Sequence, residues 1–463
     1  MSRPDPAHHR LSPARLLDVD PLLEDPKTRI VVCCGSGGVG KTTTAAALGL
    51  RAAERGRKVV VLTIDPARRL AQSMGIDSLD NTPRRVKGVD DSAGGELHAM
   101  MLDMKRTFDE IVEAHADPER AAAILGNPFY QSLSAGFAGT QEYMAMEKLG
   151  QLRARDEWDL IVVDTPPSRS ALDFLDAPKR LGSFLDGRLI RLLTAPAKLG
   201  GRAGMKFLNV GMSMMTGTLG KLLGGQLLKD VQTFVSAMDT TFGGFRTRAD
   251  ATYKLLQAPG TAFLVVAAPE RDALREAAYF VERLAAEDMP LAGLVLNRVH
   301  GSGADRLSAE RALAAAENLE EPRIVDQEGG KAVLRNSPGA QTSSDSPTPG
   351  TPAGAPGSAP EGGSPTEDAE NTEHVEDAER SMDQLTAGLL RLHADRMQML
   401  SREQRTRDRF TALHPEVAVT EVAALPGDVH DLAGLRAIGD RLAADERELP
   451  DPADQPEPPE ATA

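Results

Sequence analysis

The chain has very little cysteine, with two residues among 463, and these two, Cys33 and Cys34, are adjacent. Such a pair provides no disulfide framework, which is typical of a protein from a reducing compartment. The sequence also has no Cys-x-x-Cys pair, and its nine histidines are scattered without the spacing of metal ligands. Because structural zinc and soft metalloids are held largely by sulfur, we expect neither a zinc site nor a thiolate site for a metalloid.

Long apolar runs and an excess of positive charge are missing as well. No stretch reaches the roughly 18 uncharged apolar residues that a membrane-spanning helix needs, and residues 1–26 contain no continuous apolar core of a secretory signal. The formal net charge is −15, whereas general nucleic-acid binding requires clustered Lys and Arg. We therefore expect a cytoplasmic protein with no nucleic-acid partner.

A glycine-rich loop stands between an apolar run, Ile30 to Cys34, and a helix-favouring run that starts at Ala45. The loop matches the phosphate-binding pattern G-x-x-x-x-G-K-[ST] in its strand-to-helix setting. Its backbone N–H groups are expected to cradle nucleotide phosphates, while Lys41 reaches the β and γ oxygens and the Thr42 hydroxyl ligates Mg²⁺. The predicted nucleotide-binding residues are Gly35, Ser36, Gly37, Gly38, Val39, Gly40, Lys41, Thr42 and Thr43.

Two further apolar runs end in a carboxylate, at Asp65 and at Asp164. Open α/β sheets place ligand-facing residues at such strand ends. Asp164 is predicted to hold the Mg²⁺ shell through water, and Asp65 to position the attacking water and approach the metal. Two plainer readings remain open: Asp65 caps a helix with Pro66 at its first position, and Asp164 belongs to an ordinary strand-end turn.

Short apolar runs alternate with helical segments along most of the chain, which predicts an α/β fold with a mainly parallel sheet covered by helices on both faces. The expected strands start near Arg29, Lys58, Glu96, Asp159, Thr261, Leu291 and Val417. We expect residues 27–335 and 375–449 to form one discontinuous ATPase domain, with a helical subdomain at 179–256. Residues 1–26 are expected to be flexible, 336–374 a disordered linker and 450–463 a disordered acidic tail, because they hold few residues able to form a core.

Two helical regions have an ambiguous role. The segment 179–256 concentrates methionine, which either packs within the protein or a dimer, or forms an adaptable apolar surface for a hydrophobic protein client. After the linker, Met382, Leu385, Leu389 and Leu392 follow three-and-four spacing. We expect this stripe to pack on the ATPase core rather than in a coiled coil, because the next position is Arg396.

The chain resembles the family of ATPases that includes the arsenite-pump ATPase and the ATPase that delivers tail-anchored membrane proteins. The resemblance runs discontinuously from about Arg29 to about Gly439, most specifically in Gly35 to Thr43, Asp65-Pro66-Ala67, Asp164-Thr165-Pro166-Pro167-Ser168 with Leu172-Asp173-Phe174-Leu175, Val295-Leu296-Asn297 and Leu425-Pro426. It implies a dimeric ATPase that uses ATP and Mg²⁺, with adenine contacts at Asn297 and near Pro426. Taken alone, a strand-end Asn and a turn Pro are ordinary loop residues.

One departure from the family pattern concerns the assembly. Family loops usually carry a lysine where this chain has Ser36, and that lysine crosses the dimer interface to the partner's nucleotide. A homodimer of this chain lacks it. Three readings are open: Arg68, Arg69 or Arg169 replaces the lysine locally, Ser36 marks a slow homodimer, or the chain pairs with a related ATPase that retains the lysine. We favour the last.

The sequence thus predicts a cytoplasmic Mg²⁺-dependent ATPase that switches a dimer between conformations and lacks the cysteines for arsenite. The alternative is a nucleotide-gated binding protein, either a membrane-protein chaperone or a partition-type positioning factor.

Overall fold

A computed structural model describes residues 15–64, 69–76, 78–133, 140–166, 247–320 and 367–443, and all structural statements below concern these residues. They divide into two compact units. The first unit runs to Gly301 and resumes at Arg402, and the second comprises Ser302–Ser401. None of the described helices has both the length and the apolar character needed to cross a lipid bilayer.

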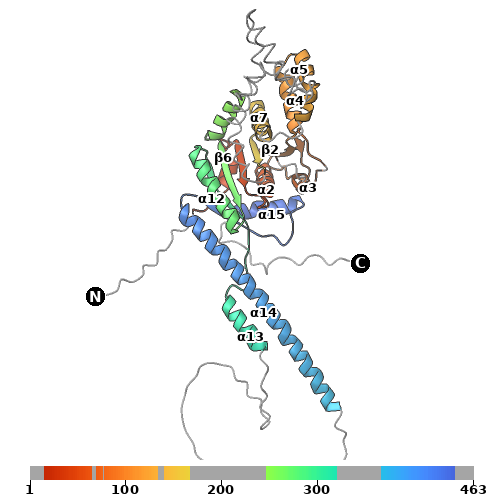
Figure 1. The fold of residues 1–463 in the computed structure, drawn as a ribbon, viewed down its shortest axis with the longest axis vertical. Helices are drawn as coiled ribbons and strands as arrows, with labels where there is room; N and C mark the ends of the chain where they lie inside the picture. The colour runs from red at the N-terminus through yellow and green to blue at the C-terminus, as the bar shows by residue number, and fades with distance from the viewer. Residues whose placement is uncertain are drawn as a thin grey trace, which may run out of the picture. The chain divides into compact units, whose positions relative to one another are not determined.

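A mainly parallel sheet forms the centre of the first unit (Figure 1). Its strands are β1 (Ile30–Gly35), β2 (Lys58–Thr63), β3 (Arg84–Arg85), β4 (Glu96–Met101), β5 (Leu160–Asp164), β6 (Thr261–Ala267), β7 (Leu291–Val299) and β8 (Val419–Ala423). In space they follow the order β3-β4-β2-β5-β1-β6-β7-β8, and only β3 runs antiparallel to its neighbour. The predicted α/β fold class is confirmed.

The seven predicted strands correspond to the observed strands other than β3. Each predicted start lies within two residues of the observed start. Buried central strands read as apolar runs, so they are visible in the sequence. The β3 strand was not predicted, because its two exposed arginines give no periodic signal. The register aligns Asp164 with both Thr63 and Cys33, so the ends of β1, β2 and β5 meet at one edge.

Helices cover both faces of the sheet. They are α1 (Asp20–Glu24), α2 (Lys41–Glu54), α3 (Arg69–Ser73), α4 (Met104–His115), α5 (Pro118–Leu125), α6 (Pro128–Leu133), α7 (Thr140–Arg155), α12 (Arg271–Ala286) and α15 (Leu432–Ala443). Side chains alternate along a strand, and Val31 of β1 faces a core that includes α2 and α15. Val32 faces the opposite core, which includes α4, α7 and α12.

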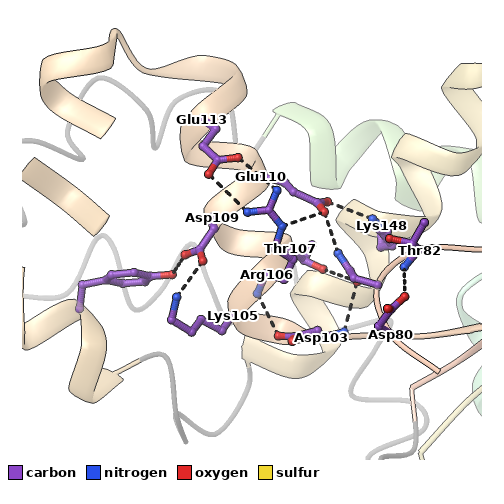
Figure 2. A network of polar contacts seen from close by, with 12 residues as sticks. Asp80, Thr82, Asp103, Lys105, Arg106, Thr107, Asp109, Glu110, Glu113 and Lys148 are labelled. Carbon is purple, nitrogen blue, oxygen red and sulfur yellow. Dashed lines mark hydrogen bonds and ion pairs between the residues drawn. The ribbon is translucent and has the colours of Figure 1, made fainter. Parts of the chain in front are cut away.

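A polar network fixes α4 against its surroundings (Figure 2). Asp103 caps the helix by accepting a hydrogen bond from the backbone N–H of Arg106. The nearly buried Lys148 of α7 donates to Glu110 of α4 over 3.0 Å. A buried charge needs such a partner, so this network sets how α4 and α7 pack.

The prediction that residues 1–26 are flexible is wrong for residues 15–26. The backbone of Leu17 donates to the Val419 carbonyl over 3.0 Å, and Val19 and Leu23 are fully buried. Asp20 of α1 forms ion pairs with Arg51 of α2 and with Arg55, which follows α2. The hydrogen bond from Arg51 lowers the pKa of the Asp20 carboxyl. Because Pro, Asp and Arg are abundant in this segment, its few apolar residues, which extend the sheet beside β8, were not recognised from the sequence.

The second unit also departs from the predicted boundaries. It contains α13 (Ala309–Glu320) and most of α14 (Glu367–Leu413). The predicted ATPase domain continued to residue 335 and resumed at 375, whereas the described chain divides at Gly301 and at Arg402. The predicted linker extended to residue 374, whereas α14 already begins at Glu367. Helix extension adds one hydrogen bond per residue, which favours continuing a long helix into a polar sequence.

The stripe of Met382, Leu385, Leu389 and Leu392 was predicted to pack on the ATPase core, and it belongs to the second unit. All four side chains are exposed. Periodicity showed that the helix has an apolar face but could not show what covers it.

Candidate functional site

The glycine-rich loop joins the end of β1 to the first residue of α2, as the sequence predicted. Gly40 caps α2 with φ of 93°, in the left-handed region that favours glycine. A Cβ on Gly35 would lie 2.0 Å from the Val266 carbonyl oxygen of β6. Only glycine fits at these two positions, and the loop therefore leads directly into the N-terminus of α2, where backbone N–H groups attract anions.

Lys41 is buried at the start of α2, and its Nζ donates to the Ser36 carbonyl oxygen over 2.7 Å. This bond bends the lysine back over its own loop. A side chain held in this way can place its ammonium group beside phosphate oxygens, where it acts as a point charge.

Asp164 connects three elements at the edge of the sheet. The carboxylate is fully buried at the end of β5, and its Oδ2 accepts hydrogen bonds from the Thr42 and Thr63 hydroxyls, each over 2.8 Å. Thr42 comes from α2 and Thr63 from the end of β2. Because the Thr42 hydroxyl donates its proton to Asp164, its oxygen lone pairs are able to face a cation.

These residues suit a small hard cation, since Mg²⁺ prefers oxygen ligands and keeps several waters. Thr42 would be a direct ligand and Asp164 a partner through water, and both oxygen types fit that role. Within the described part of the chain, no group of three or more His, Cys, Asp or Glu side chains converges to hold a metal.

A cleft of about 1120 Å³ opens over the loop. Seven of the predicted site residues line it: Gly38, Gly40, Lys41, Thr42, Thr43, Asn297 and Pro426. They come from the loop, the end of β7 and the segment after β8, so the fold gathers three distant parts of the sequence. A cleft of this size accommodates a nucleotide.

Asn297 lines this cleft where it adjoins the glycine-rich loop. Its Nδ2 donates to the Val39 carbonyl oxygen over 2.8 Å, and the side chain is buried. A Cβ on Gly40 would lie only 2.2 Å from the same Nδ2. Asn297 therefore braces the loop as well as lining the cleft beside Pro426.

Sequence reasoning missed several residues that line the cleft, among them Arg298, His300 and Glu403. Arg298 has φ of 62° and donates to the Gly38 carbonyl oxygen over 3.0 Å. His300 Nδ1 lies 2.8 Å from Glu403 Oε1. The strand-end position of Arg298 and His300 was a usable signal, but nothing in the sequence links Glu403 of α14 to them.

The remaining predicted residues divide into two groups. Gly35, Ser36, Gly37, Val39 and Asp164 belong to the loop or contact it. Asp65 lies outside the described residues, as do Arg68 and Arg169 and residues 179–246 of the predicted helical subdomain.

The two cysteines are buried on β1. Burial raises the pKa of the Cys34 thiol to about 12, and burial together with the Asp164 charge raises the pKa of Cys33. A thiol with a raised pKa is a poor metal ligand and a poor nucleophile. We therefore attribute the chemistry of the site to Lys41, Thr42 and Asp164.

Comparisons with known proteins agree with this geometry. The family model for anion-transporting ATPases matches residues 28–321. ATPase GET3 of Malassezia globosa is 29% identical over 164 residues, which cover 35% of this chain and 46% of that protein. ATPase GET3 of Podospora anserina is 25% identical over 296 residues, covering 63% of this chain and 80% of the relative.

A third relative, ATPase GET3 of Ajellomyces dermatitidis, is 27% identical over 288 residues, covering 61% of this chain and 76% of the relative. The matched family region contains the loop, Asp164 and Asn297 but ends before α14. The chain therefore belongs to the anion-transporting ATPase family and is an ATPase.

Proposed function

We propose that this protein is a cytoplasmic Mg²⁺-dependent ATPase that uses ATP binding and hydrolysis to switch a dimer between two conformations. The supporting observation is the buried Asp164 carboxylate, which accepts hydrogen bonds from Thr42 of the phosphate loop and Thr63 of β2. This network couples the nucleotide cleft to two strands and a helix. A change at the cleft then reaches the sheet through short, buried hydrogen bonds.

We assign the following roles, which the described positions of Lys41, Thr42 and Asp164 support and which rest on the sequence alone for Asp65. Lys41 and the N–H groups of Gly38 to Thr43 bind the phosphates, with Asn297 and Pro426 beside the base. Asp65, which follows an apolar run in the sequence, is assigned the role of positioning the attacking water. The Thr42 hydroxyl and, through water, the Asp164 carboxylate would hold Mg²⁺, which would supply positive charge to the transferring phosphoryl group.

Lys41→Ala and Asp65→Asn test these roles. Loss of the Lys41 ammonium removes phosphate contacts made in the bound state, so we expect the affinity for ATP to fall below detection in a fluorescent-nucleotide assay. Loss of the Asp65 carboxylate weakens chiefly the transition state, so we expect ATP binding to be retained and turnover to be lost.

Matched controls are Lys87→Ala, at an exposed lysine, and Asp288→Asn, at an exposed aspartate with φ of 53° that asparagine adopts readily. Both should hydrolyse ATP like the wild type. Turnover by Asp65→Asn equal to that of the wild type would refute the role given to Asp65.

The assembly is the second part of the proposal. Ser36 stands where the resemblance leads us to expect a lysine that reaches the partner's nucleotide. We favour a hetero-oligomer with a related ATPase that retains this lysine, because charge supplied in trans stabilises a transferring phosphoryl group. A homodimer, completed by local arginines or simply slow, is the alternative.

The isolated chain should hydrolyse ATP slowly, and the related ATPase from the same source should accelerate it. Ser36→Lys should partly restore the rate of the isolated chain. An ordinary ATPase rate from a symmetric dimer of the isolated chain would contradict the hetero-oligomer.

A nucleotide-gated chaperone for hydrophobic membrane proteins is the second candidate function. It is favoured by the concentration of methionine between residues 205 and 238 in the sequence, because thioethers adapt to varied apolar partners. Capture of clients by a turnover-deficient variant, followed by mass spectrometry, tests it. A partition-type positioning factor would instead capture no apolar segments.

A further inference from the structure

An exposed apolar stripe runs along α14. Met382, Leu385, Leu389 and Leu392 are 66%, 65%, 59% and 67% exposed. Their spacing of three, four and three residues continues through Arg396 to Met399. Residues at this spacing share one face of a helix, and a sustained three-and-four repeat is the pattern of a helix that pairs with another.

The opposite face of α14 is already covered. Ala387 and Ala394 are fully buried, as are Ala312 and Ala316 of α13. Arg391 forms an ion pair with Glu320 at the end of α13. The two helices therefore lie side by side (Figure 1), and α14 carries two apolar faces of which α13 buries only one.

Four large apolar side chains in a row are unusual on a free surface, since such patches mark contact sites. The stripe also lies beyond residue 321, where the match to the family model ends. None of the four stripe residues is among the described residues that line the nucleotide cleft.

The charge distribution along α14 indicates the occupant. Residues 367–379 include seven Asp or Glu and no Lys or Arg, whereas residues 391–409 include six Arg against three Asp or Glu. A second copy of the helix in antiparallel orientation would bring each acidic end beside a basic one. A parallel copy would place like charges together, which is unfavourable.

The antiparallel arrangement also accommodates Arg396. Consider two antiparallel copies of α14 aligned so that residue 387 of one lies opposite residue 387 of the other. Leu385 then lies opposite Leu389 of the other copy, and Met382 lies opposite Leu392. Arg396 then lies opposite position 378, which Asp377 and Glu379 flank in the sequence. In a parallel pair Arg396 would face its own copy within the apolar seam.

We propose that a second copy of this chain docks antiparallel on the stripe of α14, so that two α13–α14 pairs form a four-helix core. The pairing has two-fold symmetry and is isologous, which means that the two copies use the same surface to contact each other. It is independent of the proposed ATPase mechanism and of the chain that completes the nucleotide site.

Disulfide cross-linking of the full chain tests the geometry. Met382→Cys and Leu392→Cys together should give a covalent dimer as the main product of mild oxidation, because each new cysteine faces the other type across the seam. Within one helix these positions are about 15 Å apart, too far for an internal bond. Met382→Cys alone should give no dimer.

Two controls accompany this pair. Gln384→Cys with Gln398→Cys places two thiols on exposed positions off the stripe and should give no dimer. Adding Leu385→Glu and Leu389→Glu to the cross-linking pair should abolish the product, while Gln384→Glu and Gln398→Glu should leave it intact. The glutamate variants should keep the wild-type helical signal in circular dichroism, since the stripe is exposed.

The proposal is overturned if the Met382→Cys, Leu392→Cys pair forms no dimer. Cross-linking by Met382→Cys alone would show a parallel pair and overturn it as well. Equal cross-linking by the off-stripe pair would show random collision. Because the readout is a covalent dimer, none of these outcomes depends on ATP hydrolysis.

Discussion

Replacing Thr63 with valine would test the hydrogen bonds that hold Asp164. Thr63 is buried at the end of β2, and its hydroxyl donates to Asp164 Oδ2 over 2.8 Å. Valine has nearly the same shape but no hydroxyl. The variant thus removes one donor from a fully buried carboxylate and leaves the Thr42 donor in place.

The size of the effect follows from the kind of bond. A hydrogen bond to a charged group contributes about 1.5–3 kcal/mol to folding, so the free energy of unfolding should fall by that amount. Residues that orient a metal-bound group typically change metal affinity by about 10- to 100-fold. We therefore expect the Mg²⁺ concentration for half-maximal ATPase activity to rise roughly tenfold or more.

Thr261→Val is the matched control. Thr261 is also buried, and its hydroxyl donates over 2.8 Å to a neutral acceptor, the Leu255 carbonyl oxygen. It should lose about 1 kcal/mol of stability and keep the wild-type Mg²⁺ dependence. Urea unfolding and Mg²⁺ titration of the ATPase rate measure both quantities. If Thr63→Val lost stability but kept the wild-type Mg²⁺ titration, Asp164 would not orient the metal site.

Three further changes have defined outcomes. Arg248→Met leaves the buried Glu147 without its 2.7 Å ion-pair partner and should lower the free energy of unfolding by about 3–5 kcal/mol. Burial lowers the pKa of His98 below its ordinary value of 6.5, so the native state binds fewer protons than the unfolded state. Stability should fall as the pH drops from about 6.5 towards the lowered value, and His98→Gln should remove this dependence. Gly40→Ala should weaken ATP binding, since its Cβ would lie 2.2 Å from Asn297 Nδ2 and break the bond that braces the loop.

Each change has its own control. Lys105→Met removes an exposed ion pair with Asp109 and should cost at most about 1 kcal/mol, whereas a cost equal to that of Arg248→Met would contradict the burial argument. If the stability of His98→Gln depended on pH as the wild type does, the dependence would arise from groups other than His98. Gly303→Ala meets open space and should bind ATP normally.

The fold class and the place of the glycine-rich loop between a strand and a helix could be predicted from the sequence because their signals are local. A buried parallel strand is an apolar run, and a loop that must curl around phosphates needs glycine at fixed positions, as Gly35 and Gly40 illustrate. Asp164 was found for the same reason, since it directly follows an apolar run. The starts of seven strands were thus visible without any knowledge of their neighbours.

Tertiary structure decided what depends on contacts between distant residues. The pairing of Asp164 with Thr63, of Asn297 with Val39 and of His300 with Glu403 joins residues far apart in the chain, and no local pattern encodes such partners. The same holds for burial. Leu23 lies in a stretch rich in charge and proline yet is fully buried, while Leu385 lies in a regular apolar stripe yet is exposed. Periodicity identifies the apolar face of a segment, but only packing determines what that face meets.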